Sequence, residues 1–392
     1  MSWKEIVCVV RRLKFVKLAL KAQQSMSQLC RVFAISRKTG YQWKERFERE
    51  GGPGLRDRSS RPHRSPRQTS WVWVKRIRKM RRRHRSWGSR KLAARLRQTY
   101  GTQAPAARTI GDWLKRLKLS RRGPRRSRRG PKLRRPALTV PGRSNQVWTV
   151  DFKGWFRTQD GQRVEPLTVR DLFSRYVLSI RLLRDQSWKP VRRVFLGLFI
   201  RYGYPKIIRV DNGGPFGSNG PAGLSRLSSW WSALGIQVQF IAPGHPEQNG
   251  AHEQMHRVLK AETTKPTSRN LRSQQRRINR WIKTYNQIRP HEGLKQRPPG
   301  EVYRWKRARP RSVALSYPKN WQVRRVRSNG QIRWRGRKRF VGEAFVGYPV
   351  GLWQTSQGRS VLRFAGLVIG ELWEGDAGGM RPAKYPRRPQ DS

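Results

Sequence analysis

The feature that most constrains this chain is its charge balance. Its 392 residues include 89 Lys and Arg residues but only 22 Asp and Glu residues, and the formal net charge is +67. Because like charges repel, a chain with this excess is under heavy self-repulsion unless a polyanion neutralises it. Nucleic acid is the polyanion that such a surface suits. The few acids that remain must therefore have a use.

Length and composition narrow the class of protein further. A chain of this length is expected to form two to four domains. The sequence contains no run of about 20 apolar residues, and Lys14 and Lys17 interrupt the N-terminal apolar stretch. Cys8 and Cys30 provide neither a disulfide framework nor zinc spacing. We therefore expect a cytoplasmic, nucleoid-associated protein with no membrane partner.

Residues 1–50 are predicted to be helical. Residues 27–33 place Leu29, Cys30 and Phe33 on one helix face, and Ala34-Ile35 forms a tight turn. Ser36 then caps a second helix, in which Tyr41 and Trp43 are expected to be buried. This is the helix-turn-helix layout, although a generic helical hairpin is the alternative. The second helix would present four residues to a DNA major groove, namely Arg37, Lys38, Thr39 and Gln42.

Two linkers flank a second helical unit. Residues 51–69 are rich in Gly, Pro, Ser and Arg, and residues 70–118 resemble another helix-turn-helix. Residues 119–144 form a basic linker that is either a solubilising segment or a phosphate-binding tract, and its charge density favours phosphate binding. The arginines expected to contact DNA there are Arg121, Arg122, Arg125, Arg126, Arg128 and Arg129.

Residues 145–305 alternate strand and helix. Strands are predicted over 147–155, 164–169 and 176–183, followed by a helix over 188–202 whose apolar residues form one stripe. A strand over 206–210, a helix over 224–234, a strand over 237–241 and a final helix complete the segment. This order is that of the ribonuclease-H-like α/β fold, which is an analogy from order alone.

The C-terminal region is predicted to be β-rich. Short strands with Gly turns between residues 310 and 377 indicate a small β-barrel or sandwich, and we favour the barrel. Residues 378–392 are expected to be a disordered tail. The chain is thus predicted to be multidomain, with all-α helix-turn-helix units, then the α/β core, then the barrel.

Three acids stand where a metal site needs them. Asp151 and Asp211 each end an apolar strand, and Glu253 opens a helix after Asn249-Gly250. Carboxylate oxygens are the ligands that Mg²⁺ prefers, and a pair of Mg²⁺ ions about 4 Å apart is what phosphoryl transfer at a phosphodiester requires. We expect Asp151 to bridge two ions, with Asp211 and Glu253 each completing one. A single Asp at a strand end is more often a cap or a surface residue, so the prediction rests on the set of three.

Five segments around these acids resemble the integrase-core motifs of insertion-sequence transposases of the DDE superfamily, which includes retroviral integrases. They are residues 150–154, 171–176, 211–213, 243–253 and 285–291. The resemblance implies a transposase that binds inverted element ends, cleaves them and joins 3′-hydroxyl ends to target DNA. It also implies catalysis with two Mg²⁺ ions, with Mn²⁺ as a substitute and no small-molecule cofactor. The implied partners are double-stranded DNA and further copies of the chain in a homo-oligomer.

The resemblance leaves two candidates for the glutamate. Glu247 lies 36 positions after Asp211, which matches the usual spacing of the superfamily, and Glu253 lies 42 positions after it. The family's glutamate follows Asn-Gly by three positions on a helix, which favours Glu253. The six extra residues fit an insertion in the loop at 216–223. A rigid helix also positions a ligand better than a loop does.

Two other functions compete with this interpretation. Residues 252–256 fit the H-E-x-x-H signature of zinc proteases, but Pro246 and Asn249-Gly250 start the helix too close to the motif. His252 and His256 are therefore predicted to lie on the helix surface. The second alternative is a non-catalytic DNA-binding protein, either a repressor or an inactive element remnant. The presence of all three acids argues against loss of function by drift.

Overall fold

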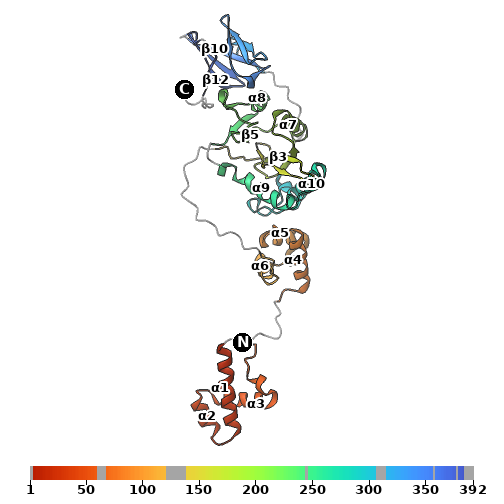
Figure 1. The fold of residues 1–392 in the computed structure, drawn as a ribbon, viewed down its shortest axis with the longest axis vertical. Coiled ribbons are helices and arrows are strands. Elements are labelled where there is room, and N and C mark those ends of the chain that lie inside the picture. The colour runs from red at the N-terminus through yellow and green to blue at the C-terminus, as the bar shows by residue number, and fades with distance from the viewer. Residues whose placement is uncertain are drawn as a thin grey trace. The chain divides into compact units, whose positions relative to one another are not determined.

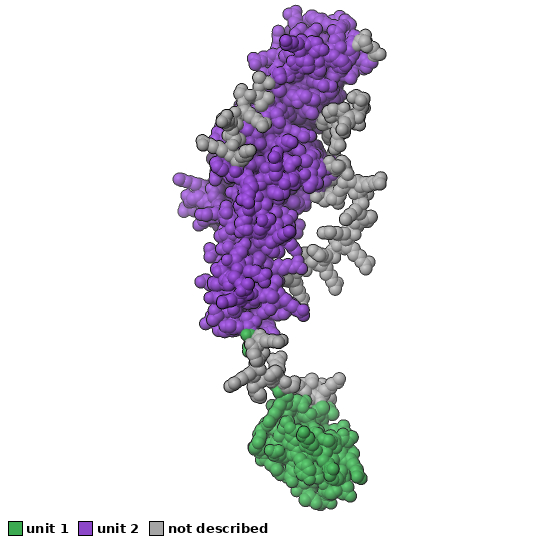
Figure 2. All heavy atoms as spheres, turned by 180° about the vertical axis from the view of Figure 1, so that it is seen from behind, with its two compact units in different colours: residues 1–68 green, residues 69–392 purple. Residues whose placement is uncertain are grey.

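A computed structural model describes residues 3–59, 68–120, 138–242, 246–305, 315–355, 358–376 and 378–383. The chain forms two compact units, residues 1–68 and 69–392 (Figure 2). Among the described residues, no helix is long and apolar enough to cross a membrane.

The first unit is a helix-turn-helix, as predicted. Its helices are α1 (Trp3–Leu20), α2 (Met26–Val32) and α3 (Arg37–Glu50), followed by the 3₁₀ helix η1 (Gly52–Leu55) (Figure 1). Ser36 caps α3 by accepting from the Thr39 amide at 3.1 Å. Gly40 is required by the packing, because a Cβ there would lie 2.7 Å from Cys30 Sγ. The apolar residues of α1 and α2 thus bury the inner face of α3.

Of the two aromatic residues predicted to be buried in this unit, one is exposed. Trp43 packs its ring against Phe15, but Tyr41 is 57% exposed. The two residues lie two positions apart on α3, a spacing that turns one of them away from the face that buries the other.

The second unit begins with three helices. They are α4 (Trp71–Arg83), α5 (Ser89–Tyr100) and α6 (Ala107–Arg116), with the 3₁₀ turn η2 (Gly101–Gln103) between the last two. Trp87, Leu92, Ile110 and Leu114 are buried together in their small core. The structure therefore confirms that residues 70–118 form a helical unit.

A mixed sheet forms the centre of the second unit. Its strand order is β2 (Phe156–Arg157), β3 (Arg163–Asp171), β1 (Val147–Phe152), β5 (Ile207–Val210) and β6 (Gln237–Phe240), and β4 (Val177–Leu183) also pairs with β3. The pairs β1–β3 and β3–β4 are antiparallel, whereas β1–β5 and β5–β6 are parallel. The predicted order of strands and helices is confirmed, and the short β2 was not predicted.

Helices cover both faces of this sheet (Figure 1). On one face, α7 (Trp188–Tyr202) and α8 (Arg226–Ala233) bury Phe195 and Trp231 against Trp148 and Leu167 of the strands. On the other, α9 (Gly250–Thr263) and α10 (Leu271–Gln287) pack on residues such as Ile180. The short elements are η3 (Pro221–Gly223), η4 (Pro246–Asn249), η5 (Glu292–Leu294), α11 (Pro299–Val302) and η6 (Glu343–Phe345).

The C-terminal region is an antiparallel sheet. The strand order is β13 (Arg381–Pro382), β12 (Leu367–Leu372), β11 (Ser360–Phe364), β10 (Pro349–Gln354) and β7 (Gln322–Arg325). A separate hairpin joins β8 (Gln331–Trp334) to β9 (Arg337–Phe340). Within the described residues β13 and β7 are the two edges and do not pair, so the pairing does not close the sheet into the predicted barrel. Strand patterns specify the strands themselves but not this long-range closure.

Candidate active site

The alternation of side chains along β1 and β5 brings two of the predicted acids together. Trp148 and Ile208 are cross-strand partners in the parallel register, as are Thr149 and Arg209. The same offset, carried two residues further, sets Asp211 beside Asp151 on strands about 4.8 Å apart. Because neighbouring side chains of a strand point to opposite faces, both acids lie on the face opposite the buried Trp148 and Ile208. That face is covered by α9.

Polar contacts fix the start of α9 over the same strands. Arg170 of β3 donates from Nη1 to the Ala251 carbonyl at 2.5 Å. Asn249 donates from Nδ2 to Asp151 Oδ2 at 3.1 Å. Glu253 lies in the first turn of this helix and is exposed. Glu253 is close enough to Asp151 for its charge to raise the pKa of that aspartate.

The two histidines of α9 correct an expectation from sequence. His252 and His256 were predicted on the helix surface, but they are only 1% and 8% exposed. His252 Nε2 and His256 Nε2 lie 2.6 and 2.8 Å from Thr168 Oγ1 on β3. β1 and β3 present polar side chains, including Thr149 and Thr168, to this part of α9, so its inner face is polar rather than apolar here.

The electrostatics of the site reflect the proximity of its acids. The pKa of Asp151 is raised to about 7. Burial is the largest cause, and the negative charges of Asp211 and Glu253 add to it. Burial also raises the pKa of Asp211. Burial lowers the pKa of His256 to about 3, helped by the charges of Lys153 and Arg170. The 3.9 Å contact between His256 Nδ1 and Asp151 Oδ2 is consequently not an ion pair at neutral pH.

The acids fit a cation that the protein itself does not supply. Among the described residues, no Lys or Arg forms an ion pair with Asp151, Asp211 or Glu253. Asp211 Oδ1 is buried and has no hydrogen-bond partner, although a buried polar atom normally has one. Oxygen donors of this kind suit a hard divalent cation. Among the described residues, no group of three or more His, Cys, Asp or Glu side chains is arranged to hold a metal ion, so the expected three-acid cluster is not preformed.

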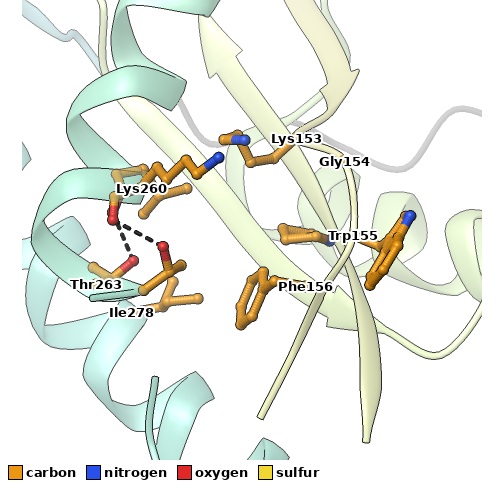
Figure 3. Close-up of a pocket in the computed structure, with 10 residues that line it drawn as sticks. Lys153, Gly154, Trp155, Phe156, Lys260, Thr263 and Ile278 are labelled. Carbon is orange, nitrogen blue, oxygen red and sulfur yellow. Dashed lines mark hydrogen bonds between the residues drawn. The ribbon is translucent and has the colours of Figure 1, made fainter. Parts of the chain in front are cut away.

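A small cavity lies between α9 and the chain segment that follows Asp151. It has a volume of about 100 Å³, and its floor includes Phe156, Leu259 and Ile278. Lys153 and Lys260 border it, and their amino groups point toward each other (Figure 3). Burial lowers the pKa of Lys153, and the charge of Lys260 lowers it further. Two cations held this close would be relieved by a phosphate.

The remaining residues singled out from the sequence are one further acid and the residues expected to contact DNA. Asp171, in the resembling segment 171–176, is buried and accepts from the Ser174 hydroxyl at 2.6 Å and the Asn145 amide at 2.7 Å, so its role is structural. In the first unit Arg37, Lys38 and Gln42 are exposed, and the Thr39 hydroxyl contacts Ser36 at 2.8 Å. The predicted tract Arg121, Arg122, Arg125, Arg126, Arg128 and Arg129 lies outside the described residues.

Sequence reasoning missed the polar residues that support the acids. Thr149, Thr168 and Arg170 are fully or almost fully buried on β1 and β3. Each alternates with apolar residues that face α7 and α8, as Thr168 does between Leu167 and Val169. Polar residues at the second face of an otherwise apolar strand are a signal that could have located them.

Models of known protein families match several segments of the chain. Two models described as integrase core domains match residues 141–246 and 234–299. Helix-turn-helix and homeodomain-like models match residues 11–63 and 39–114. A model of the C-terminal domain of IS481 family transposases matches residues 321–360.

Individual relatives match over part of their length. The chain is 32% identical to an uncharacterised 31.7 kDa protein of insertion element IS407 from Burkholderia multivorans, over 45% of this chain and 62% of that protein. It is 30% identical to an uncharacterised 39.2 kDa protein of IS476 from Xanthomonas euvesicatoria, over 45% and 49%. The chain thus spans about half to three fifths of the length of these relatives.

Solved structures give a weaker likeness. The catalytic core domain of HTLV-2 integrase, solved in complex with magnesium, is 17% identical, covers 42% of this chain and 100% of its own, and has a TM-score of 0.34. An intasome structure of simian T-cell lymphotropic virus covers 73% of this chain and 91% of its own, with 15% identity and a TM-score of 0.37.

The fold and the family matches define an integrase-core protein with N-terminal helix-turn-helix domains. Within that class, the chain is similar to proteins of insertion elements, and its C-terminal region matches the C-terminal domain of IS481 family transposases.

Proposed function

We propose that this protein is a DNA transposase that binds inverted element ends, cleaves them and joins their 3′-hydroxyls to target DNA. The observation that carries the proposal is the trio of acids in the cation-rich chain. Three features support it: Asp151 lies on β1 and Asp211 follows β5 in the same parallel register, the charges of Asp211 and Glu253 raise the pKa of Asp151, and no described Lys or Arg forms an ion pair with any of the three. We propose Glu253 rather than Glu247 as the third ligand, because α9 holds it over the strands.

The proposed cofactor is a pair of Mg²⁺ ions, with Mn²⁺ as a substitute. Asp151, Asp211 and Glu253 would hold the ions, and Asp211 offers a buried Oδ1 that has no hydrogen-bond partner. When bound, the metal would supply activation of the attacking hydroxyl and stabilisation of the leaving oxygen. Lys153 and Lys260 would hold a phosphate of the reacting strand beside Asp151. In the reaction a bond forms between the 3′-oxygen and phosphorus, one phosphodiester bond breaks, and the leaving oxygen takes up a proton.

The proposed partners are element ends and target DNA. Arg37, Lys38, Thr39 and Gln42 would read the ends from the N-terminus of α3, and the arginines at 121–129 would contact the backbone. Because two ends must be held together for joining, we propose a homo-oligomer as the active form.

A joining assay tests the proposal. The DNA is a duplex carrying the inverted repeats that flank the gene, the metal is Mg²⁺, and the protein is the full chain. The parent is expected to join this DNA to a target plasmid, and Asp211→Asn is expected to bind the duplex without joining it. Asp160→Asn is the control, because Asp160 is an exposed turn residue whose carboxylate accepts from Thr158. Equal joining by parent and Asp211→Asn would remove the catalytic proposal, and binding without joining by the parent would favour a repressor.

A further inference from the structure

The Thr168 hydroxyl has three neighbours, and counting its protons assigns the protons of two histidines. Thr168 Oγ1 donates to the Asp151 carbonyl at 2.8 Å, its partner across the β1–β3 ladder. A hydroxyl carries one proton and two acceptor lone pairs. With its proton committed to Asp151, the Thr168 oxygen can only accept from His252 Nε2 and His256 Nε2. Both rings must therefore carry a proton on Nε2.

The second nitrogen of each ring then has a defined role. His252 Nδ1 has no proton, so it accepts from the Thr149 hydroxyl at 3.0 Å. His256 Nδ1 is also bare and points toward Asp151 Oδ2 at 3.9 Å. Asp151 Oδ2 already accepts from Asn249. The lone pairs of His256 Nδ1 and of Asp151 Oδ2 thus face each other, and only a cation or a proton donor fits between these two atoms.

These contacts form one buried network from the strands to the catalytic helix. Thr149 and Thr168 are 3% and 0% exposed. Thr149 lies on the same strand as Asp151, and Thr168 is the partner of Asp151 on β3. Both histidines lie on α9, on either side of Glu253 in the sequence. Buried polar groups are costly unless every hydrogen bond is made, so a saturated hydroxyl allows one docking position for the helix.

We infer that Thr168, together with His252 and His256, positions the acidic site: the saturated hydroxyl fixes both rings with the proton on Nε2 and so sets where α9 holds Glu253 relative to Asp151. This inference deepens the proposed function and rests on it for the metal. The hydrogen-bond assignment itself does not depend on catalysis. Supporting residues of this kind typically change metal affinity by about 10- to 100-fold when they are replaced.

The first test reads the tautomers directly. The full chain is labelled with ¹⁵N-histidine, and the ring nitrogens are observed by NMR without metal at neutral pH, with His252→Gln and His256→Gln used to assign the signals. We expect both residues to show protonated Nε2 and unprotonated Nδ1. A proton on Nδ1 of either ring would overturn the inference, whatever the protein does to DNA.

The second test measures metal affinity. Mn²⁺ binding to the full chain is followed by electron paramagnetic resonance for the parent, Thr168→Val and Thr168→Ser. The valine variant is expected to bind roughly 10- to 100-fold more weakly, and the serine variant, which keeps the hydroxyl, close to the parent. Thr263→Val is the matched control, because Thr263 is also buried on the α9 side but donates only to Leu259 of its own helix, at 2.7 Å.

Two outcomes decide the matter. Equal Mn²⁺ affinity of Thr168→Val and the parent, or equal weakening by Thr263→Val, would overturn the positioning role. If Thr168→Val does not fold, Thr149→Val replaces it, with a smaller loss expected because His252 keeps its bond to Thr168. A parent that shows the expected tautomers and metal binding but joins no DNA would remove the proposed transposase activity and leave the positioning role intact.

Discussion

Two glutamates on one helix have opposite surroundings. Glu262, near the end of α9, accepts from Trp281 Nε1 at 2.6 Å and pairs with Arg289 at 3.2 Å, and Ser86 also donates to it. Glu253, in the first turn, has no Lys or Arg partner among the described residues and faces Asp151, whose pKa it raises. The first glutamate is a structural anion, and the second is left for a cation from solution.

The difference shows how a strongly basic chain protects an acidic site. With 89 Lys and Arg residues, nearby cations are abundant, and an acid without one must be kept apart from them by the fold. The buried contacts near Asp151 come from neutral groups, Thr149, Thr168 and the two histidines, and Lys153 lowers the pKa of Asp151 without forming an ion pair with it among the described residues. Four experiments break or sharpen this comparison, in order of expected effect.

The largest effect is expected from Glu253→Gln. Because the metal contributes several kcal/mol of transition-state stabilisation, losing a ligand should lower the joining rate by roughly 10³-fold or more. The melting temperature should not fall, since the change removes a like charge beside Asp151. Joining is measured on the inverted-repeat duplex with Mg²⁺. A rate within tenfold of the parent would show that Glu253 is not a ligand.

The next effect is a dependence of metal affinity on pH. The pKa of Asp151 is raised to about 7, so the metal-free folded protein keeps a proton there that the unfolded chain releases near pH 4. The stability gained from this proton is present at low pH and is lost as the pH rises toward 7. Metal must displace the proton, so Mn²⁺ affinity should fall about tenfold per pH unit below 7 and level off above it.

Asp211→Asn provides the control for this pH profile. It removes a negative charge that raises the pKa of Asp151, so the midpoint of any remaining metal binding should move to lower pH. Isothermal titration between pH 5.5 and 8.5 measures both profiles. A flat profile for the parent would mean that Asp151 is already ionised throughout this range.

A smaller effect is expected from Lys260→Ala, which lies on α9 between the two glutamates. If Lys260 contacts one phosphate, the slope of log affinity for DNA against log salt should become shallower by about 1. Binding is measured by fluorescence anisotropy at several salt concentrations. Lys283→Ala, at an exposed lysine of α10, is the control and should leave the slope unchanged.

Glu262→Gln should have the smallest effect on joining and a clear effect on stability. It leaves the buried Arg289 without its charged partner, which costs about 2 kcal/mol and lowers the melting temperature by several degrees. Joining at 25 °C should stay within about twofold of the parent. Differential scanning calorimetry measures the melting temperature, and the joining assay measures the rate. The expected pattern is the opposite of that for Glu253→Gln, which lowers the joining rate but not the melting temperature. Loss of joining without loss of stability would mean that Glu262, like Glu253, serves the reaction rather than the fold.

Much of the fold could be predicted because periodicity is a local property of the sequence. The stripe of α7 and the alternation of β1, β3 and β5 indicate those elements directly, and Ser36 signals the start of α3. Failures came where distant residues decide the outcome. Tyr41 is exposed, the C-terminal sheet is open in the described residues, and β2 depends on pairing with β3.

The sequence by itself determined the basic charge, the order of strands and helices, and which acids stand at strand ends, because these properties follow from residue type and spacing. Only the tertiary structure decided that Asp151 and Asp211 share a face, since this depends on the register of two parallel strands 60 residues apart in the chain. It also decided that His252 and His256 are buried against Thr168 rather than exposed. A helix has a defined inner face only after the surface that it packs on has formed.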